Sequence, residues 1–277
     1  MNVILNDRTS TTFEVYSYGE IVAHSGNPVY SSHFGLHWWP SQATGEILIG
    51  GYISSNGVWY DYSTMSISSF NTVSTYTLVA FENTNVTDVV GNVMRGPYDM
   101  FFRNDYLKTV NLPFLEQLGW GGFTRCPRLE YVSLPNLRMV RRNTFFSCPM
   151  LRQIYLPKCS YIESNAFQSC VSMSWASFPE CTYIDEAAFV NDYALEYVYI
   201  GGDCQVINED AFYGCSVLSE LILDCPGVPS LSGGLTFGLT PLARGSGHIY
   251  VRSSLVDTYK SAAGWSSLSS VITPLNP

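Results

Sequence analysis

Charged residues are scarce in this sequence of 277 residues, because Asp, Glu, Lys and Arg together make up only 13%. Soluble proteins typically carry about 25%. Only 14 residues are basic, and the formal net charge is -9 at pH 7. Nucleic-acid binding depends on clustered Lys and Arg side chains, so we expect no nucleic-acid partner. A surface of such low charge is more typical of extracellular or virion proteins than of cytosolic enzymes.

Long apolar runs and catalytic motifs are also missing. No stretch approaches the roughly 20 apolar residues that cross a bilayer, so we expect no membrane insertion. The N-terminal segment lacks a basic stretch followed by an apolar core, so we expect no secretion signal there. The sequence contains no phosphate-binding loop, Gly-x-Ser-x-Gly, His-Glu-x-x-His or dinucleotide-binding fingerprint. We therefore predict no enzyme activity, no catalytic residue and no cofactor.

What the sequence does contain is an internal repeat of 22 to 23 residues. Its clearest column is phenylalanine, and aliphatic residues recur in three further columns at fixed offsets. The phenylalanine column consists of Phe101, Phe123, Phe145, Phe167, Phe189 and Phe212. A single unit cannot bury these side chains, whereas stacked units share one continuous core.

Each unit predicts one short strand. Leu129, Val132 and Leu134 have the Leu-x-x-Leu-x-Leu spacing, and the last two residues alternate toward the same face. Pro135 then ends the strand, because proline cannot donate a hydrogen bond to the ladder. The repeat therefore predicts a solenoid in which the strands of successive units stack side by side.

The segment from Leu156 to Cys170, with Leu-Pro, Ile162, Ala166-Phe167 and a final Cys, resembles the BspA-like class of leucine-rich repeats. The tail HIYVRSSLVDTYKSAAGWSSLSSVITPL is similar to the segment that closes such repeats, so the resemblance covers about residues 98–275. The resemblance implies a leucine-rich-repeat solenoid that serves adhesion or recognition. It also points to bacterial surface proteins, proteins of mucosal parasites and phage proteins from gut bacteria.

The predicted fold is β-rich and has three parts. Residues 1–95 lack the repeat and alternate in strand fashion, notably at 12–16, 46–49 and 75–80, so we expect a small β-sandwich-like attachment domain. Residues 96–225 form the leucine-rich-repeat solenoid, and residues 226–277 form a C-terminal cap. The cap contains a short helix at 253–260, which Ser253 or Ser254 is expected to cap and Gly264 to end. At residues 200–202 the repeat loses its proline and gains one residue, which predicts a kink or altered stacking.

The eight cysteines fall into repeat columns rather than into a disulfide framework. Cys126, Cys148, Cys170 and Cys215 share one column, and Cys159, Cys181 and Cys204 share another that earlier units fill with leucine. Cysteine that alternates with leucine behaves as a small buried hydrophobe. We predict free core thiols, with a metal or disulfide ladder as the alternative.

Metal ligands are sparse. His33 and His37 have a helical ligand spacing, but Gly35 and Pro40 oppose a helix, and no third ligand is evident. We predict no metal site. The neighbouring run of residues 58–62, which holds one Trp and two Tyr, is read as an ordinary strand with core aromatics, with a sugar-binding surface as the alternative.

The strand register places two columns of side chains on the outer face of the repeats. Five of their twelve members are aromatic, and rigid aromatic side chains are favoured in recognition surfaces. The candidate ligand-binding residues are Tyr131, Tyr155, Trp175, Tyr197 and Tyr199. The alternative is β-propensity alone, because Tyr and Trp suit exposed strand positions in any case.

The leading functional hypothesis is a phage virion protein that docks through residues 1–95 and presents its repeats to a protein or glycan ligand on a cell surface. The first alternative is a bacterial surface or secreted adhesin of the BspA-like kind. The second is a glycan-acting enzyme with a repeat appendage, because Glu163, Asp185, Glu186, Glu209 and Asp210 recur in successive turns. A homo-oligomer is compatible with each hypothesis.

Overall fold

The computed structural model describes residues 98–275 in full and, before them, the backbone of eight short strands. These strands are β1 (Asn2–Leu5), β2 (Thr11–Val15), β3 (Ile21–Ser25), β4 (Ile47–Ile49), β5 (Gly51–Ile53), β6 (Trp59–Asp61), β7 (Asp88–Gly91) and β8 (Arg95–Gly96). The chain divides into two compact units, Met1–Leu137 and Arg138–Pro277.

The first unit contains a parallel sheet with the strand order β11-β9-β7-β1-β4. Its repeat strands are β9 (Thr109–Asn111), β10 (Gln117–Leu118) and β11 (Tyr131–Ser133). β9 pairs in parallel with both β7 and β11, while β2 with β3 and β5 with β6 form antiparallel pairs. Strands β2 and β4 overlap the strands predicted from alternation at 12–16 and 46–49, and β6 overlaps the strand expected at 58–62. Residues 75–80, His33 and His37 lie outside the described residues, so the sandwich and the domain boundaries stay predictions.

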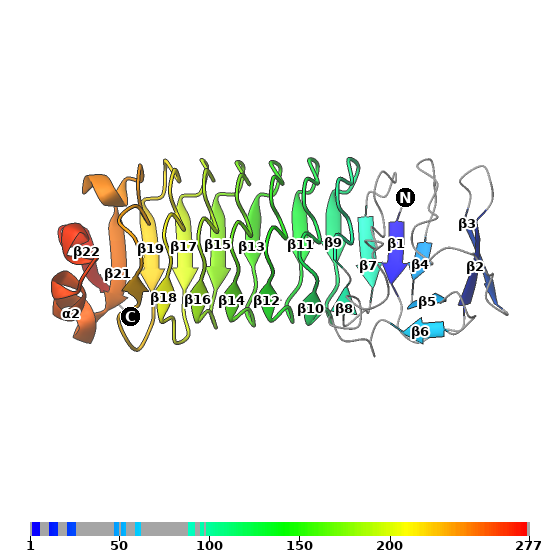
Figure 1. Cartoon of the computed structure of the whole chain (residues 1–277), viewed down its shortest axis with the longest axis horizontal. Coiled ribbons are helices and arrows are strands. Elements are labelled where there is room, and N and C mark those ends of the chain that lie inside the picture. The colour runs from blue at the N-terminus through cyan, green and yellow to red at the C-terminus, as the bar shows by residue number, and fades with distance from the viewer. Residues whose placement is uncertain are drawn as a thin grey trace. The chain divides into compact units, whose positions relative to one another are not determined.

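The second unit is a β-solenoid with two parallel sheets, whose strands appear as successive arrows in Figure 1. The longer sheet runs β13 (Gln153–Tyr155), β15 (Trp175–Phe178), β17 (Tyr197–Ile200), β19 (Glu220–Leu223), β21 (His248–Arg252) and β22 (Ile272–Leu275). The other sheet runs β12 (Met139–Val140), β14 (Tyr161–Ile162), β16 (Tyr183–Ile184), β18 (Val206–Ile207) and β20 (Ser230–Leu231). The predicted leucine-rich-repeat solenoid is thereby confirmed.

The phenylalanine column forms a stack of rings through the interior of this unit. The Phe167 and Phe189 rings lie 5.0 Å apart at 6°, and the Phe189 and Phe212 rings lie 5.0 Å apart at 5°. Phe237 continues the stack, with its centroid 5.5 Å from that of Phe212. The sequence pattern missed Phe237, because it follows Phe212 by 25 residues instead of 22 or 23.

The cysteines behave as the repeat columns predicted: all eight are free and buried. The thiols of Cys170 and Cys215 donate to the carbonyl oxygens of Phe145 and Phe189, at 3.1 Å in both cases. Burial raises the pKa of the Cys159 thiol to about 12. Because only a thiolate is a strong nucleophile or metal ligand, this thiol is chemically inert at neutral pH.

The altered unit at residues 200–202 does not interrupt the sheet. β17 pairs with β15 and β19 in continuous parallel register up to Ile200. Gly201 then passes so close to the preceding turn that a Cβ atom would lie 2.5 Å from the Pro179 carbonyl oxygen. Two glycines therefore absorb the inserted residue in the turn, and the kink expected from the sequence does not form within the strands.

The C-terminal cap consists of η1 (Leu242–Arg244), η2 (Ser253–Leu255), α2 (Val256–Ser261) and η3 (Ser266–Leu268), together with the two last strands. The predicted short helix is confirmed as η2 followed by α2. Its predicted serine cap is wrong, because the Ser253 hydroxyl donates instead to the Leu275 carbonyl oxygen at 3.4 Å. The Trp265 indole N–H donates to the Pro229 carbonyl oxygen at 2.7 Å, which fastens the cap to the last repeat turn. None of the described helices has the length and apolarity needed to cross a membrane.

Candidate functional site

The candidate site in the second unit is the outer face of the sheet formed by β13, β15, β17, β19 and β21. Alternation along each strand turns every second side chain outward. The parallel register aligns these side chains in two rows that run across the strands. The first row is Gln153, Trp175, Tyr197, Glu220 and His248, and the second is Tyr155, Ser177, Tyr199, Ile222 and Tyr250.

Three of the predicted binding residues form one aromatic cluster on this face. The Trp175 and Tyr197 rings are nearly parallel, with centroids 6.1 Å apart and an interplanar angle of 9°. The Tyr155 ring lies on the opposite side of Trp175, with a centroid distance of 6.3 Å and a tilt of 40°. Tyr155 is 53% exposed, whereas Trp175 and Tyr197 are half-buried against their neighbours. We call these three residues the aromatic row; Trp175 and Tyr197 come from the first row of side chains, and Tyr155 comes from the second.

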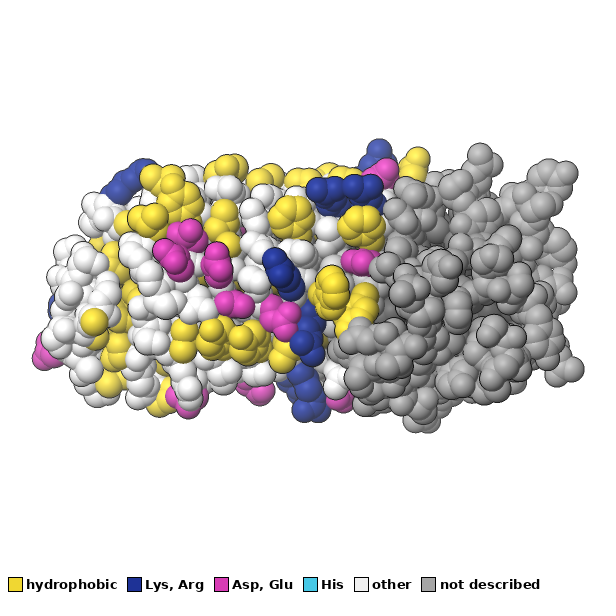
Figure 2. All heavy atoms as spheres, viewed as in Figure 1, with side chains coloured by type: hydrophobic (Ala, Val, Ile, Leu, Met, Phe, Trp, Pro, Cys, Tyr) yellow, Lys and Arg dark blue, Asp and Glu magenta, His cyan; other side chains and the backbone are white. Residues whose placement is uncertain are grey.

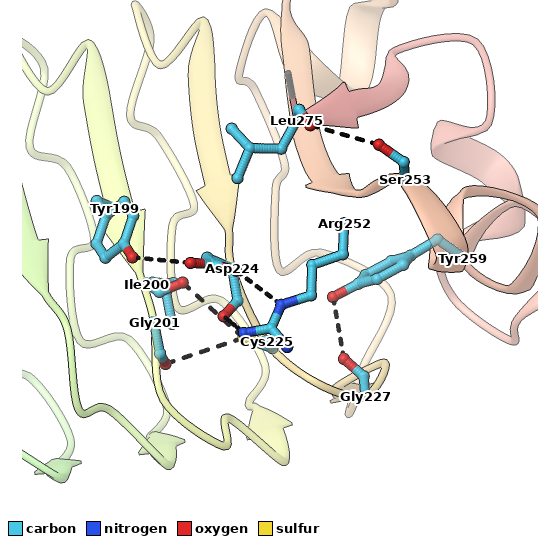
Figure 3. A network of polar contacts seen from close by, with 10 residues as sticks. All are labelled: Tyr199, Ile200, Gly201, Asp224, Cys225, Gly227, Arg252, Ser253, Tyr259 and Leu275. Carbon is cyan, nitrogen blue, oxygen red and sulfur yellow. Dashed lines mark hydrogen bonds and ion pairs between the residues drawn. The ribbon is translucent and has the colours of Figure 1, made fainter. Parts of the chain in front are cut away.

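Tyr199, the fourth predicted residue in this unit, belongs to a polar network rather than to the aromatic row. Figure 3 shows Tyr199 and Arg252 both directed at Asp224. The Tyr199 hydroxyl donates to Asp224 Oδ2 at 3.3 Å, and Arg252 Nε donates to Asp224 Oδ1 at 2.7 Å. Partial burial, reinforced by the negative charge of Asp224, raises the pKa of Tyr199. Tyr199 therefore helps to fix Asp224, which in turn holds the start of the cap through Arg252.

Tyr131 lies on β11 of the first unit, where it is 48% exposed. Its exposure agrees with the outward position predicted for it. Because it belongs to the other compact unit, it is not part of the aromatic row defined by Tyr155, Trp175 and Tyr197.

One predicted outward residue is in fact buried. Ser177 is only 5% exposed, although the strand register turns it to the outer face. It lies in register between Tyr155 and Tyr199. A serine side chain is short, so the larger side chains around it cover it. This position therefore offers a ligand no direct contact.

Sequence reasoning missed the last strand of the face. His248 and Tyr250 on β21 continue the two rows, and their rings stack at 5.6 Å. The repeat pattern did not include them, because Ile249 follows its register partner Leu221 by 28 residues. The alternation in HIYVR was the signal that could have placed them on the outer face.

Acidic side chains border the aromatic row. Glu196 and Glu220 are exposed, and the Glu196 carbonyl oxygen accepts hydrogen bonds from the N–H groups of Ser219 and Glu220, each at 3.1 Å. Partial burial raises the pKa of Tyr197, and the negative charge of Glu220 adds to the shift. On the side seen in Figure 2, acidic and hydrophobic side chains lie next to one another over the region of β15 to β19.

Two of the acidic residues in the turns, Glu163 and Asp185, have structural partners. Glu163 forms an ion pair with Arg141 at 2.9 Å and accepts the Arg142 N–H at 2.8 Å. Asp185 accepts a hydrogen bond from Asn208 Nδ2 at 2.8 Å. These contacts join neighbouring turns, as expected for local caps. Within residues 98–275, no group of three or more His, Cys, Asp and Glu residues is arranged to hold a metal ion.

Comparison with known proteins agrees with the repeat architecture. Residues 97–219 match the BspA type leucine rich repeat region in six copies. A leucine-rich repeat protein from Bacteroides ovatus aligns at 18% identity with a TM-score of 0.36, over 58% of this chain and 53% of that chain. A leucine rich cell surface protein from Faecalibacterium prausnitzii aligns at 14% identity with a TM-score of 0.32, over 96% of each chain. No curated protein matches the sequence. Residues 97–219 of this chain are therefore similar to the BspA type of leucine-rich repeats.

Proposed function

We propose that this protein is a non-enzymatic binding module that attaches to its ligand through the outer face of β13 to β21. The observation that carries the proposal is the aromatic row, in which Tyr155, Trp175 and Tyr197 lie side by side on three neighbouring strands. Exposed aromatic side chains that form one continuous patch are typical of recognition surfaces. The alternative is β-propensity alone, which requires no ligand. Attachment measurements on a variant that lacks the three aromatic rings distinguish this alternative from the proposal.

Within this proposal, the protein acts as an adhesin on a bacterial cell surface. The BspA type of the repeats supports a surface protein that binds or adheres. The virion role that we expected from the sequence receives no support from the comparisons, and the adhesin alternative is favoured over it. The proposal also includes a partner that binds residues 1–95, and it is compatible with a homo-oligomer.

The proposal is tested by attachment of the full-length chain to bacterial cells and to mucin-coated surfaces. The variant Tyr155→Ser/Trp175→Ser/Tyr197→Ser should lose most of its attachment while keeping its circular dichroism spectrum. The matched control, Tyr161→Ser/Tyr183→Ser, removes a stacked aromatic pair from the other sheet of the same unit. Equal attachment by wild type and the triple variant would refute the proposal.

The absence of enzyme activity needs its own measurement. The wild-type chain should release no products from a panel of glycans under conditions in which it attaches to cells. If products appear and disappear again in Glu163→Gln or Asp185→Asn, the glycan-acting alternative is correct and the non-enzymatic assignment is wrong.

A further inference from the structure

Basic side chains gather on two successive turns of the first unit. Arg103 lies on one turn, Arg125 and Arg128 lie on the next, and all three are exposed. Such a group is unusual in a chain that has only 14 basic residues and a formal net charge of -9. Figure 2 shows basic side chains next to one another at the edge of the molecule above β9 and β11. We call Arg103, Arg125 and Arg128 the arginine edge.

The register of the turns places two of these arginines at the same position. The Arg103 N–H donates to the Thr124 carbonyl oxygen at 2.9 Å, so Arg103 lies beside Arg125. Neighbouring turns stack about 4.8 Å apart, and both arginines have left-handed backbone, with φ of +52° and +57°. In later turns this position holds short residues, of which Asn and Gly suit such backbone best: Ser147, Ser169, Asn191 and Gly214. The shape of the turn therefore does not call for arginine.

Aromatic rings support two of the guanidinium groups. The Cζ atom of Arg103 lies 5.1 Å from the centroid of the Phe102 ring, and that of Arg128 lies 5.5 Å from the centroid of the Tyr106 ring on the preceding turn. Asn104 fixes this preceding turn, because its Oδ1 accepts the Tyr106 N–H at 3.1 Å. A ring beneath a guanidinium group holds it in place and leaves the N–H donors at its rim for an anion.

The positive charge of the arginine edge is not neutralised within residues 98–275, where no carboxylate forms an ion pair with any of its three arginines. The exposed charged residues of 98–130 are four basic side chains and one acidic side chain: Arg103, Lys108, Arg125, Arg128 and Asp105. Like charges at the same position on neighbouring turns repel each other. A bound anion would relieve this repulsion, so the arginine edge has the electrostatics of an anion-binding site.

We propose that the arginine edge binds a sulfated polysaccharide, whose sulfate groups lie against Arg103, Arg125 and Arg128. A guanidinium fork donates parallel hydrogen bonds to oxyanions and is weakly hydrated, which suits a sulfate ester. Three forks on two adjacent turns favour a ligand that repeats its negative charge over a single small anion. This inference goes beyond the proposed function, because the arginine edge and the aromatic row belong to different compact units.

Two other kinds of polyanion fit the arginine edge less well. An acidic peptide gains affinity by pairing with free main-chain groups, yet the N–H groups of Phe101 and Arg103 already donate to the next turn, at 2.7 and 2.9 Å. Single-stranded nucleic acid stacks its bases on aromatic rings, and the Phe102 and Tyr106 rings already support guanidinium groups. Recognition therefore depends on charge, which a sulfated polysaccharide repeats along its length.

The test measures binding of the full-length chain to fluorescein-labelled dextran sulfate by fluorescence anisotropy. Dextran sulfate should bind with an affinity that falls as salt is added, and uncharged dextran should not bind. Affinity should fall about tenfold or more in Arg103→Gln/Arg125→Gln/Arg128→Gln, since three exposed charge contacts are lost. The matched control Arg142→Gln/Arg244→Gln/Lys260→Gln removes the same charge from exposed positions of the second unit and should bind as wild type does.

The inference is overturned if dextran sulfate does not bind, or if both triple variants lose affinity equally. It is also overturned if polyglutamate or oligothymidylate binds as tightly as dextran sulfate. Circular dichroism checks that the variants fold. If the variant of the arginine edge unfolds, Arg125→Asn replaces it, because Asn191 occupies the same position in a later turn. This single variant should bind dextran sulfate about threefold more weakly than wild type, and unchanged binding overturns the inference.

The outcome is distinguishable from failure of the proposed function. Loss of the arginine edge should weaken binding of dextran sulfate, whereas Tyr155→Ser/Trp175→Ser/Tyr197→Ser should leave it unchanged. Attachment to cells that survives loss of the aromatic row refutes the proposed function alone. Binding of dextran sulfate that depends on the aromatic row and not on the arginines refutes the present inference alone.

Discussion

Asp192 accepts a hydrogen bond from the N–H group of Cys170 on the preceding turn, with a distance of 2.7 Å to Oδ1. Its other carboxyl oxygen, Oδ2, is buried without a hydrogen-bond partner. Asp192 occupies the position that most other units fill with cysteine, deep inside the solenoid. Burial raises its pKa well above the ordinary value of an aspartate.

Replacing Asp192 with Asn should therefore stabilise the protein at neutral pH. The folded-state pKa is raised, so the stability that protonated Asp192 contributes is complete below about pH 4, the ordinary aspartate pKa. That stability is lost as pH rises toward the raised pKa. The variant should gain about 1 to 3 kcal/mol at pH 7 and little at pH 3.5, as measured by urea unfolding. A wild-type chain that gains stability from the ionisation of Asp192 would contradict this account.

Truncating the ring stack should destabilise the second unit strongly. Phe189 lies between Phe167 and Phe212 and is completely buried. Phe189→Ala should reduce the free energy of unfolding by about 3 to 5 kcal/mol. Tyr193→Ala, at a neighbouring position that is 51% exposed, is the control and should change stability by less than about 0.5 kcal/mol. Comparable losses in both variants would argue against a stacked core.

Two positions in corresponding turns should change the stability of the protein in opposite directions, one when its leucine is replaced by glycine and the other when its glycine is replaced by alanine. Leu239 has a φ of +65° and is 52% exposed, whereas Gly214 has a φ of +79°. Leu239→Gly should stabilise the protein by about 0.5 to 1 kcal/mol, because left-handed backbone is costly for leucine. Gly214→Ala should destabilise it by at least about 1 kcal/mol, because its Cβ would also lie 2.5 Å from Asn191 Oδ1. Thermal unfolding of both variants checks the pair.

The cap should depend on the indole hydrogen bond of Trp265. Trp265→Phe keeps most of the buried ring but leaves the Pro229 carbonyl oxygen without its donor. The expected cost is about 1 to 3 kcal/mol, and hydrogen exchange should rise first in β22 and α2. Lys260→Ala, an exposed change on the same helix, serves as the control. Unchanged exchange in β22 would show that the indole does not fasten the cap.

Much of the solenoid could be predicted because the apolar columns of the repeat correspond to buried side chains. Phe101 and Phe212 mark the two ends of a column whose members are all fully buried, and the cysteine columns follow the same rule. The strands that carry this alternation could also be predicted, because alternating apolar residues followed by proline are typical of a short strand that ends at the proline. The second sheet, for example Tyr161–Ile162 on β14, was not predicted as strand because two residues carry no measurable period.

Features that depend on contacts between neighbouring turns could not be predicted from the sequence. Ser177 is buried by larger residues that lie 22 positions away on each side, so its own strand pattern is misleading. Ser253 has the chemistry of a helix cap, but its hydroxyl bonds to the carbonyl oxygen of Leu275. The sequence predicted the residues of the aromatic row only as separate outward side chains. It also predicted Tyr199 as a binding residue, whereas in the structure the Tyr199 hydroxyl donates a hydrogen bond to Asp224.

The central claim is that the outer face of β13 to β21 contacts the ligand, and hydroxyl-radical footprinting of the unmodified chain on cells tests it most directly. Side-chain oxidation would be compared between free and cell-bound protein. We predict several-fold protection of Tyr155, Trp175 and Tyr197 on binding, with Tyr161 and Tyr183 of the other sheet unchanged. Protection of Tyr161 and Tyr183 with unchanged oxidation of the aromatic row would contradict the account.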